Sequence, residues 1–339
     1  MTAEVVGAIL LAVLALYAVL GGADFGGGLW DLLAGGDRRS RAPRELIDET
    51  ITPVWESNHV WLIFALVVFW TGFPGAFAAV MTADALPLWL AVLGIVLRGA
   101  GFAFRKEVHG LRAERFLGAT FAVSSLLTPF FMGTVVGSVA SRRVALDAQQ
   151  TTLATWTDAT SLLVGALFIA VCAYLAAVYL VGEASRREDA ACERYFRRRA
   201  LLASVIAGAL SIATLAELHR SNHVLYHGLT GRALALVVLA SVCGLVVIAL
   251  LASGRSRGLR PPATIGVAAV VCGWGIAQRP TLLPGTTLTL ANGSADHGTL
   301  IALIVVFAVA VLLVGPAFAL LFSLQERRML HSDPPSSTG

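Results

Sequence analysis

Long runs of apolar residues, separated by short polar segments, recur along almost the whole chain. A helix needs about 20 apolar residues to cross the hydrocarbon core of a bilayer, and about nine runs reach or approach that length. They cover approximately residues 5–33, 53–72, 76–104, 116–140, 158–182, 200–217, 232–252, 262–278 and 299–324. This pattern predicts an all-α polytopic membrane protein with about nine transmembrane helices. We expect a single integral membrane domain over residues 1–328 and a disordered cytoplasmic tail over residues 329–339.

Composition narrows the class of protein further. Of the 339 residues, 57% are hydrophobic and 14% are charged, and the mean hydropathy is +0.78. Soluble domains carry about 25% charged residues and a smaller apolar fraction, so an ordinary soluble domain is excluded. The four cysteines lie far apart in the sequence and show no metal-ligand spacing, which indicates small core residues rather than a metal or redox site.

The basic residues lie mainly in the polar segments between the apolar runs. If the N-terminus is outside, 19 of the 25 Lys and Arg residues lie in cytoplasmic loops and the tail, five lie outside, and Arg98 lies within a predicted helix. Short cytoplasmic loops are enriched in Lys and Arg, so this asymmetry predicts an N-out, C-in orientation. Because the net charge of +4 arises from these loops, we expect contacts with membrane lipids and none with nucleic acid.

A cluster of polar side chains opens the second apolar run. Thr52-Pro53 predicts a helix start, because Pro at the first helical position loses only an amide that has no intrahelical partner. Glu56 and His59 are three residues apart and so share a helix face, and Trp55 and Asn58 form a second pair beside them. A Glu in a first turn is stabilised by the helix dipole and often has no other role. Ionisable groups at membrane helices, in contrast, are often functional.

Two further ionisable residues lie within predicted helices. Asp24 lies in the first helix among small residues, including Gly22 and Gly26, whose spacing allows another helix to approach closely. We expect that groove to receive a helix of a partner subunit. Arg98 lies about 10 Å inside the end of the third predicted helix, at a rise of 1.5 Å per residue. It must therefore extend to the interface or pair with an acid, for which Glu56 and Asp24 are the candidates.

Three segments match motifs of one protein family. The polar cluster follows the pattern Pro-x-Trp-Asp-Gly-Asn-(Glu or Gln)-Val-Trp-Leu, matched by Pro53, Trp55, Asn58, Val60, Trp61 and Leu62. Glu56 replaces the usual Asp of this pattern, and His59 replaces the Glu or Gln. Residues 21–28 are similar to Asp-Gly-Phe-Asp-x-Gly-x-Gly, but Gly21 replaces the first acid. Residues 97–105 are similar to Leu-Arg-Gly-x-x-Phe-Glu-Phe-Arg, with Ala103 in place of the acid. Together the segments resemble subunit II of cytochrome bd-type quinol oxidases and mark a divergent member.

This resemblance implies a fold, partners and cofactors. The helices are expected to form two four-helix bundles plus a peripheral helix, in the inner (cytoplasmic) membrane of a bacterium. The chain is expected to brace a larger subunit I, which carries haem b, haem d and the quinol site, with a small single-span subunit as a further candidate partner. The complex is expected to be an oxidoreductase that transfers electrons from quinol to dioxygen. No metal site is expected in this chain.

The same resemblance suggests residue roles. Glu56, Asp24 and His59 are the candidate catalytic residues and would carry protons inward from the cytoplasm, because a proton path needs titratable groups inside the membrane. The candidate cofactor-binding residues are Asn58, Arg98 and Arg105, with Trp55 as a candidate quinone contact.

Two other interpretations remain open. A proton-coupled secondary transporter would use the same acids, although the two halves of the chain show no corresponding pair of broken helices. Separately, His219, His223 and His227 recur every four residues and would line one face of a continuous helix, where imidazoles bind zinc or copper. Against a metal site, this segment follows the sixth predicted helix into a loop, and no further ligands match it.

Overall fold

The computed structural model describes residues 1–34, 41–104, 111–146 and 152–326, apart from some side chains within these ranges. In these ranges the chain forms twelve helices and no strand, so the predicted all-α fold is confirmed. The helices are α1 (Thr2–Ala34), α2 (Arg41–Gly72), α3 (Pro74–Ala83), α4 (Ala85–Phe104), α5 (Leu111–Ala140), α6 (Leu153–Trp156), α7 (Ala159–Arg186), α8 (Ala190–Ser221), α9 (His223–Thr230), α10 (Leu234–Ala252), α11 (Arg260–Gln278) and α12 (His297–Glu326).

Most of these helices are long and apolar enough to cross a membrane. Six pass the test of length and composition on the described residues: α1, α5 over Val123–Ala140, α7, α8, α10 and α11. A seventh span arises if the end of α2 is counted together with α3, and α4 and α12 carry shorter apolar stretches. The predicted spans correspond to α1, α2, α4, α5, α7, α8, α10, α11 and α12. The chain is therefore a multi-pass membrane protein.

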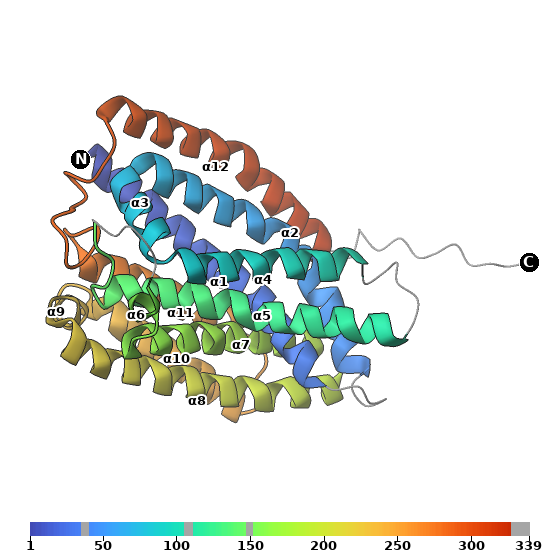
Figure 1. Cartoon of the computed structure of the whole chain (residues 1–339). Helices are drawn as coiled ribbons and strands as arrows, with labels where there is room; N and C mark the ends of the chain where they lie inside the picture. The colour runs from blue at the N-terminus through green and yellow to red at the C-terminus, as the bar shows by residue number, and fades with distance from the viewer. Residues whose placement is uncertain (35–40, 105–110, 147–151, 327–339) are drawn as a thin grey trace, which may run out of the picture.

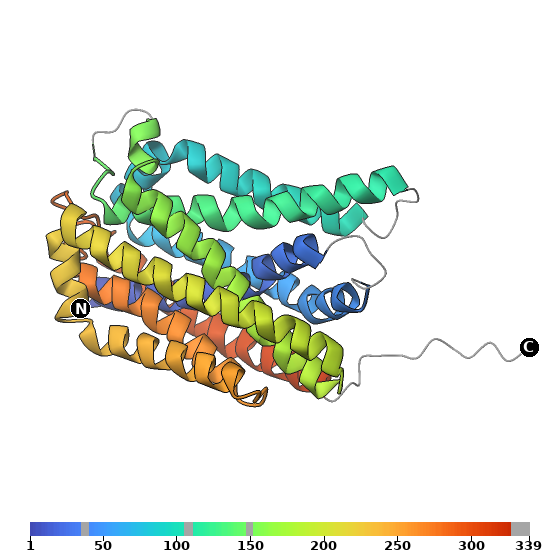
Figure 2. The ribbon, with the colours of Figure 1, turned by 90° about the horizontal axis from the view of Figure 1, so that it is seen from below.

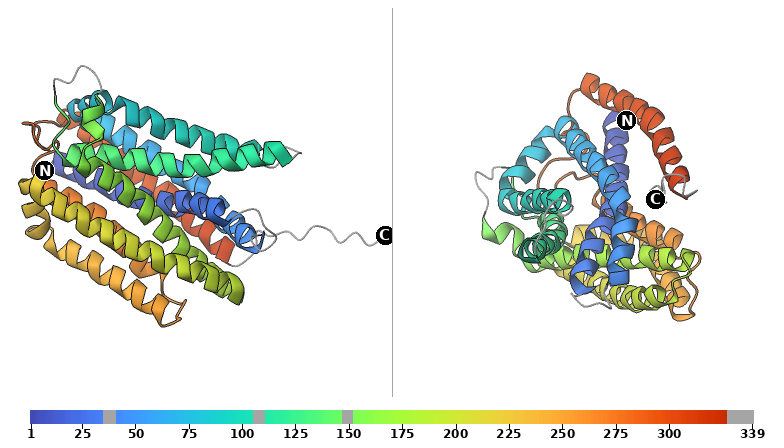
Figure 3. Two further views of the ribbon diagram at one scale, coloured as in Figure 1. Left: turned by 60° about the horizontal axis from the view of Figure 1, so that its bottom comes forward. Right: turned by 90° about the vertical axis from the view of Figure 1, so that its right-hand side faces the viewer.

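The first helix lies in the middle of the molecule. α1 contacts α2, α5, α7, α11 and α12. α4 pairs with α5, α7 with α8, and α10 with α11, which gives one group of α1, α2, α4 and α5 and a second of α7, α8, α10 and α11 (Figure 2, Figure 3). α12 lies at the periphery against α1 and α2 (Figure 1). This arrangement matches the expected two bundles and peripheral helix.

Small residues bring α1 and α7 into close contact. A Cβ atom at Gly26 would overlap the carbonyl group of Cys172, and one at Gly22 would lie 2.7 Å from Leu175 Cδ1. The indole nitrogen of Trp30 also donates a hydrogen bond to the Ala173 carbonyl, at 2.8 Å. The expectation that this groove receives a helix of a partner subunit is therefore wrong, because α7 of the same chain fills it.

The second helix begins earlier than predicted. α2 starts at Arg41 and continues through Pro53, so the predicted helix start at Thr52-Pro53 is wrong. Two apolar residues explain the extension, since Leu46 and Ile47 are buried and pack in one cluster with Trp30 of α1. Their burial stabilises the helical turns before Pro53.

The third predicted span is interrupted. A bend of 116° separates the end of α2 from α3, and α3 ends at Ala83, one residue before Asp84. α4 then begins at Ala85. Pro87 explains the interruption, because a continuous helix would need its missing N–H to bond the Ala83 carbonyl. The predicted span over residues 76–104 is therefore two helices, of which α4 is the crossing segment.

The short helices gather at one end of the molecule. The N-terminus, α3, α6 and α9 lie at this end, which we call the N-terminal end (Figure 1). The segment between α11 and α12 closes it, because Leu283 is buried in a cluster with Val6, Phe73 and Leu300. The orientation of this end toward the outside of the cell stays a prediction.

Candidate functional site

A buried ion pair joins α1 to α4. Arg98 of α4 is 1% exposed and Asp24 of α1 is fully buried. Arg98 Nη2 lies 2.5 Å from Asp24 Oδ1 and donates a second hydrogen bond to the Asp24 carbonyl at 2.8 Å. A buried charge needs a partner of opposite sign, because desolvation would otherwise cost several kcal/mol. Asp24 is therefore the acid that the position of Arg98 within its helix requires.

Three neighbours complete the surroundings of the guanidinium group. Arg98 Nη1 donates a hydrogen bond to Ser125 Oγ of α5. The Phe121 and Phe25 rings lie with their centroids 4.3 and 5.2 Å from Arg98 Cζ, at distances that allow cation–π attraction. A Cβ atom at position 28 would overlap Ser125 Oγ, so Gly28 is needed for this approach. The site thus connects α1, α4 and α5.

Ser125 and the two phenylalanines were not among the residues predicted from the sequence. The signal for the serine was present, because Ser124 and Ser125 interrupt the apolar run of the fifth helix. Both serines donate a hydrogen bond to the Phe121 carbonyl of their own helix, and Ser125 also accepts one from the guanidinium group of Arg98. Sequence alone could not separate these two neighbours without knowing which face of α5 meets α4.

Asn58 lies buried beside α1. It is 1% exposed, and neither amide atom has a hydrogen-bond partner in the described part of the chain. A Cβ atom at Gly21 would lie 2.9 Å from Asn58 Nδ2 and 3.0 Å from Asn58 Oδ1. The amide therefore occupies the space next to position 21, where the resembling motif carries an acid. Asp24 Oδ2, one helical turn further along α1, is likewise buried without a partner.

The remaining predicted site residues are placed only in part. Trp55, Glu56 and His59 lie on α2, but their side chains are outside the described part of the structure. Arg105 lies in the segment 105–110, which is also outside the described residues. The structure therefore brings together Asp24 and Arg98, places Asn58 of α2 against Gly21 of α1, and leaves the contacts of the other four residues untested.

The histidine series lies on two helices. α8 ends at Ser221, and α9 begins at His223 after a break at Asn222. The break is fixed by the Asn222 amide, which donates to the Ala140 carbonyl and accepts a hydrogen bond from the Leu225 N–H. The rings of His219 and His223 have centroids 5.2 Å apart. The continuous helix that a metal site would need is absent, and the described residues contain no cluster of three metal ligands.

The described histidines also do not suit a haem in the membrane interior. All four are exposed and lie at or near the ends of helices: His219, His223, His227 and His297. A haem iron needs an axial ligand inside its binding pocket, most often His. The described part of this chain therefore offers no histidine suited to hold a buried haem.

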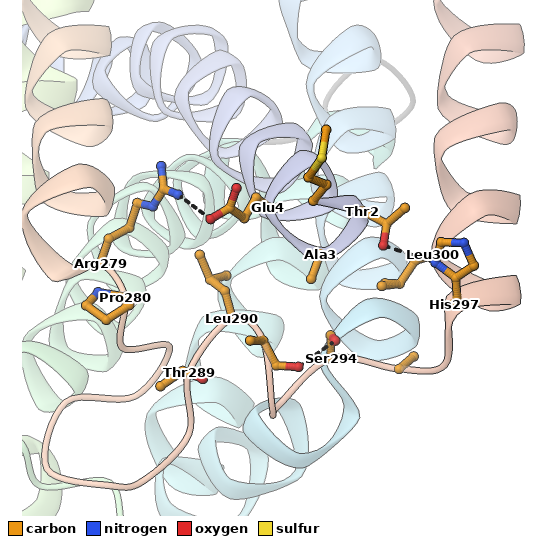
Figure 4. Close-up of a pocket in the computed structure, with 13 residues that line it drawn as sticks. Thr2, Ala3, Glu4, Arg279, Pro280, Thr289, Leu290, Ser294, His297 and Leu300 are labelled. Carbon is orange, nitrogen blue, oxygen red and sulfur yellow. Dashed lines mark hydrogen bonds and ion pairs between the residues drawn. The ribbon is translucent and has the colours of Figure 1, made fainter.

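A cavity in the described part of the chain lies away from these residues. It has a volume of about 420 Å³ and lies at the N-terminal end between α1, the segment after α11 and the start of α12. Two contacts border this cavity (Figure 4): Arg279 Nη2 lies 2.9 Å from Glu4 Oε1, and Thr2 Oγ1 lies 3.3 Å from His297 Nδ1. Twenty residues of α1 separate Glu4 from Asp24, a rise of about 30 Å. The cavity is thus separate from the Asp24–Arg98 pair.

Comparisons with known proteins agree with the fold and with the sequence motifs. The profile of the family described as cytochrome bd terminal oxidase subunit II matches residues 2–325. The chain is 30% identical over 141 residues to the cytochrome bd ubiquinol oxidase subunit 2 of Bacillus subtilis, and this covers 41% of the chain and 40% of the relative. It is 25% identical over 123 residues to the cytochrome bd-I ubiquinol oxidase subunit 2 of Escherichia coli, covering 36% of the chain and 32% of that protein.

A solved structure shows the same fold over nearly the whole chain. One chain of the bd oxidase from Geobacillus thermodenitrificans superposes with a TM-score of 0.75 at 22% identity, covering 96% of this chain and 98% of that one. The aligned parts of the Bacillus subtilis and Escherichia coli relatives are less than half of each protein, but the family profile spans almost every residue described here. The chain therefore belongs to the cytochrome bd terminal oxidase subunit II family.

Proposed function

We propose that the chain works as subunit II of a membrane-bound oxidase that transfers electrons from quinol to dioxygen. The match of the family profile over residues 2–325 carries this proposal. A partner subunit I supplies haem b and haem d, which carry out dioxygen reduction, and contains the quinol site. This division of labour is supported by the described histidines, since all four are exposed. The chain acts in the inner membrane, where it packs beside subunit I.

In this proposal, Asp24 and Arg98 form a fixed ion pair rather than a proton carrier. Arg98 donates one hydrogen bond to the Asp24 carboxylate and one to the Asp24 backbone carbonyl, and both side chains are buried. A carboxylate held by a buried cation in this way is fixed in place. The pair instead holds α1 against α4 and α5.

Glu56 is then the acid best placed to carry protons, with His59 beside it. The helix dipole no longer explains this acid, because α2 begins at Arg41 and Glu56 lies four turns inside it. By helical spacing, position 56 belongs to the same row of α2 as Val60, Ile63 and Val67. These three side chains are 49%, 61% and 44% exposed on this chain, so the row is open to lipid or to subunit I. An acid on this row is positioned to pass protons to the partner.

A secondary transporter is the weaker alternative. It would need paired broken helices in the two halves of the chain. In the described residues, the bent pair of membrane helices is α2 with α3, in the first half. The family match supports the oxidase and gives the transporter no support.

Glu56→Gln tests the proton-carrying role most directly. Gln keeps the shape and hydrogen-bonding capacity of Glu but cannot release a proton, so quinol-driven oxygen consumption should fall about tenfold or more. Glu56→Asp should restore much of the activity, because Asp titrates similarly and is usual in the resembling motif. His59→Gln should have a milder effect. The assay compares purified complexes with equal haem content and subunit ratio, and full activity of Glu56→Gln would remove the proton role from this residue.

A further inference from the structure

A buried carboxyl group lies at the joint between α3 and α4, distant from the ion pair described above. Asp84 is fully buried. Its backbone N–H donates to the Val80 carbonyl and its own carbonyl accepts from the Leu88 N–H, so the chain on both sides fixes its position. Fourteen residues of α4 separate it from Arg98, a rise of about 21 Å. Asp84 precedes the crossing helix and lies at the N-terminal end of the molecule.

The hydrogen bonds around Asp84 indicate which group supplies each proton. Ser138 Oγ of α5 lies 2.5 Å from Asp84 Oδ2 and 2.8 Å from the carbonyl oxygen of Val135. Both are hydrogen-bond distances, but a serine hydroxyl carries one proton and a carbonyl oxygen carries none. If Ser138 donates to Val135, the proton between Ser138 and Asp84 must come from the carboxyl group. The short O···O distance suits such a bond.

The surroundings also disfavour an ionised Asp84. No cation pairs with it in the described part of the chain, where Arg142 and Arg143 follow α5 and are exposed. Asp84 Oδ1 is buried and has no hydrogen-bond partner there. An ionised carboxylate with one hydroxyl contact would lose most of its hydration without compensation. The neutral acid, which leaves a carbonyl oxygen at Oδ1, fits this environment better.

A second acid, Asp158, acts electrostatically on Asp84. Asp158 caps α7, where it accepts hydrogen bonds from the Thr160 N–H at 3.1 Å and from Ser161 Oγ at 2.5 Å. Burial, with a smaller contribution from the nearby Asp158 carboxyl group, raises the pKa of Asp84 to about 6, and the contact with Ser138 opposes this rise.

We propose that Asp84 is a proton-binding site in which the neutral carboxyl group donates a hydrogen bond to Ser138 and fastens the α3–α4 joint to α5. Since the pKa of the folded state lies above the ordinary value of Asp, the stabilising contact is fully present at low pH and is lost as the pH rises through about 6. The site couples packing at the N-terminal end to the pH on that side of the membrane. It does not depend on the proton path proposed through Glu56.

Asp84→Asn tests this site in the purified complex. The Asn amide can donate to Ser138 as the neutral acid does, without a charge at high pH. When the pH is raised from about 5 to about 8, the thermal unfolding midpoint of the parent should decrease more than that of Asp84→Asn. At the higher pH we expect the variant to be the more stable protein. In infrared difference spectra at the lower pH, the variant should lack one carbonyl band of a neutral carboxylic acid.

Two further variants make the result unambiguous. Asp158→Asn alters the N-cap of α7, so it should lower the midpoint and leave the neutral-acid band unchanged. Ser138→Ala removes the acceptor, so the neutral-acid band should persist at a shifted frequency. The proposal is overturned if Asp84→Asn lowers the midpoint equally at both pH values, or if neither Asp84→Asn nor Ser138→Ala alters the neutral-acid band.

Discussion

At the scale of single residues, the buried pair Asp24–Arg98 shows how an intramembrane cation is stabilised. Three groups from two neighbouring helices stabilise Arg98 of α4: the Asp24 carboxylate on α1, and the Ser125 hydroxyl and the Phe121 ring on α5. Each would be weak in water and is stronger in the low-dielectric interior. The pair is thus a structural connection, and its energy depends on both partners being present.

Removing one partner should therefore be more costly than removing both. Arg98→Met or Asp24→Leu leaves an uncompensated buried charge, and each should destabilise the complex by about 3–5 kcal/mol. The double variant should be more stable than either single variant. Denaturant unfolding of the purified complexes in detergent measures this double-mutant cycle. Additive losses, or a loss well under 1 kcal/mol for Arg98→Met, would show that the pair does not stabilise the chain.

Much of this site could be predicted from residue types and spacing. Because Arg98 lies inside an apolar helix, it was expected to pair with an acid, and Asp24 was one of two candidates. Ser125, Phe25 and Phe121 could not be predicted, because hydroxyl and aromatic side chains are common in apolar helices and only the packing of α4 on α5 selects them. Asp84 likewise interrupts an apolar run, but its partner Ser138 is distant in the sequence.

At the scale of elements, the α1–α7 contact depends on glycine. A Cβ atom at Gly26 would overlap the Cys172 carbonyl, which belongs to the backbone and cannot rotate away. Gly26→Ala should therefore separate the helices and cost about 1–3 kcal/mol, with a lower thermal midpoint and yield of the complex. Gly208→Ala on α8 is the matched control, because nothing lies within 4 Å of its Cβ position. An unchanged midpoint for Gly26→Ala would contradict the packing described here.

The element boundaries show where hydrophobic pattern succeeds and where it fails. The long apolar runs located the crossing helices, because length and hydropathy alone decide that property. The predicted start of α2 was wrong, because Leu46 and Ile47 extend the helix by packing on α1. Such tertiary contacts cannot be recognised from the sequence of a charged segment. The break at Asp84 was not predicted for a different reason. Pro87 lies in an apolar run, and the hydropathy pattern does not register the hydrogen bond that its missing N–H removes.

For the whole molecule, the asymmetry of the basic residues predicts its orientation in the membrane. A reporter fused after Arg257 should be cytoplasmic, and one fused near Asn292 should be external, because 19 of the 25 basic residues lie on the side assigned to the cytoplasm. Activity of a compartment-specific reporter in intact cells measures each position. The opposite pattern would place Asp84 on the cytoplasmic side and invert the direction of the proposed proton path.

We propose above all that this chain is part of a haem-bearing quinol oxidase. The most direct measurement is purification of the tagged chain from its native membrane, followed by a subunit count, a reduced-minus-oxidised spectrum and an assay of quinol-driven oxygen consumption. We expect the chain to purify with a larger subunit, to show the bands of haem b and haem d, and to consume oxygen when quinol is supplied. A chain that purifies alone and colourless, and that moves a solute across vesicles along a proton gradient, would contradict the account.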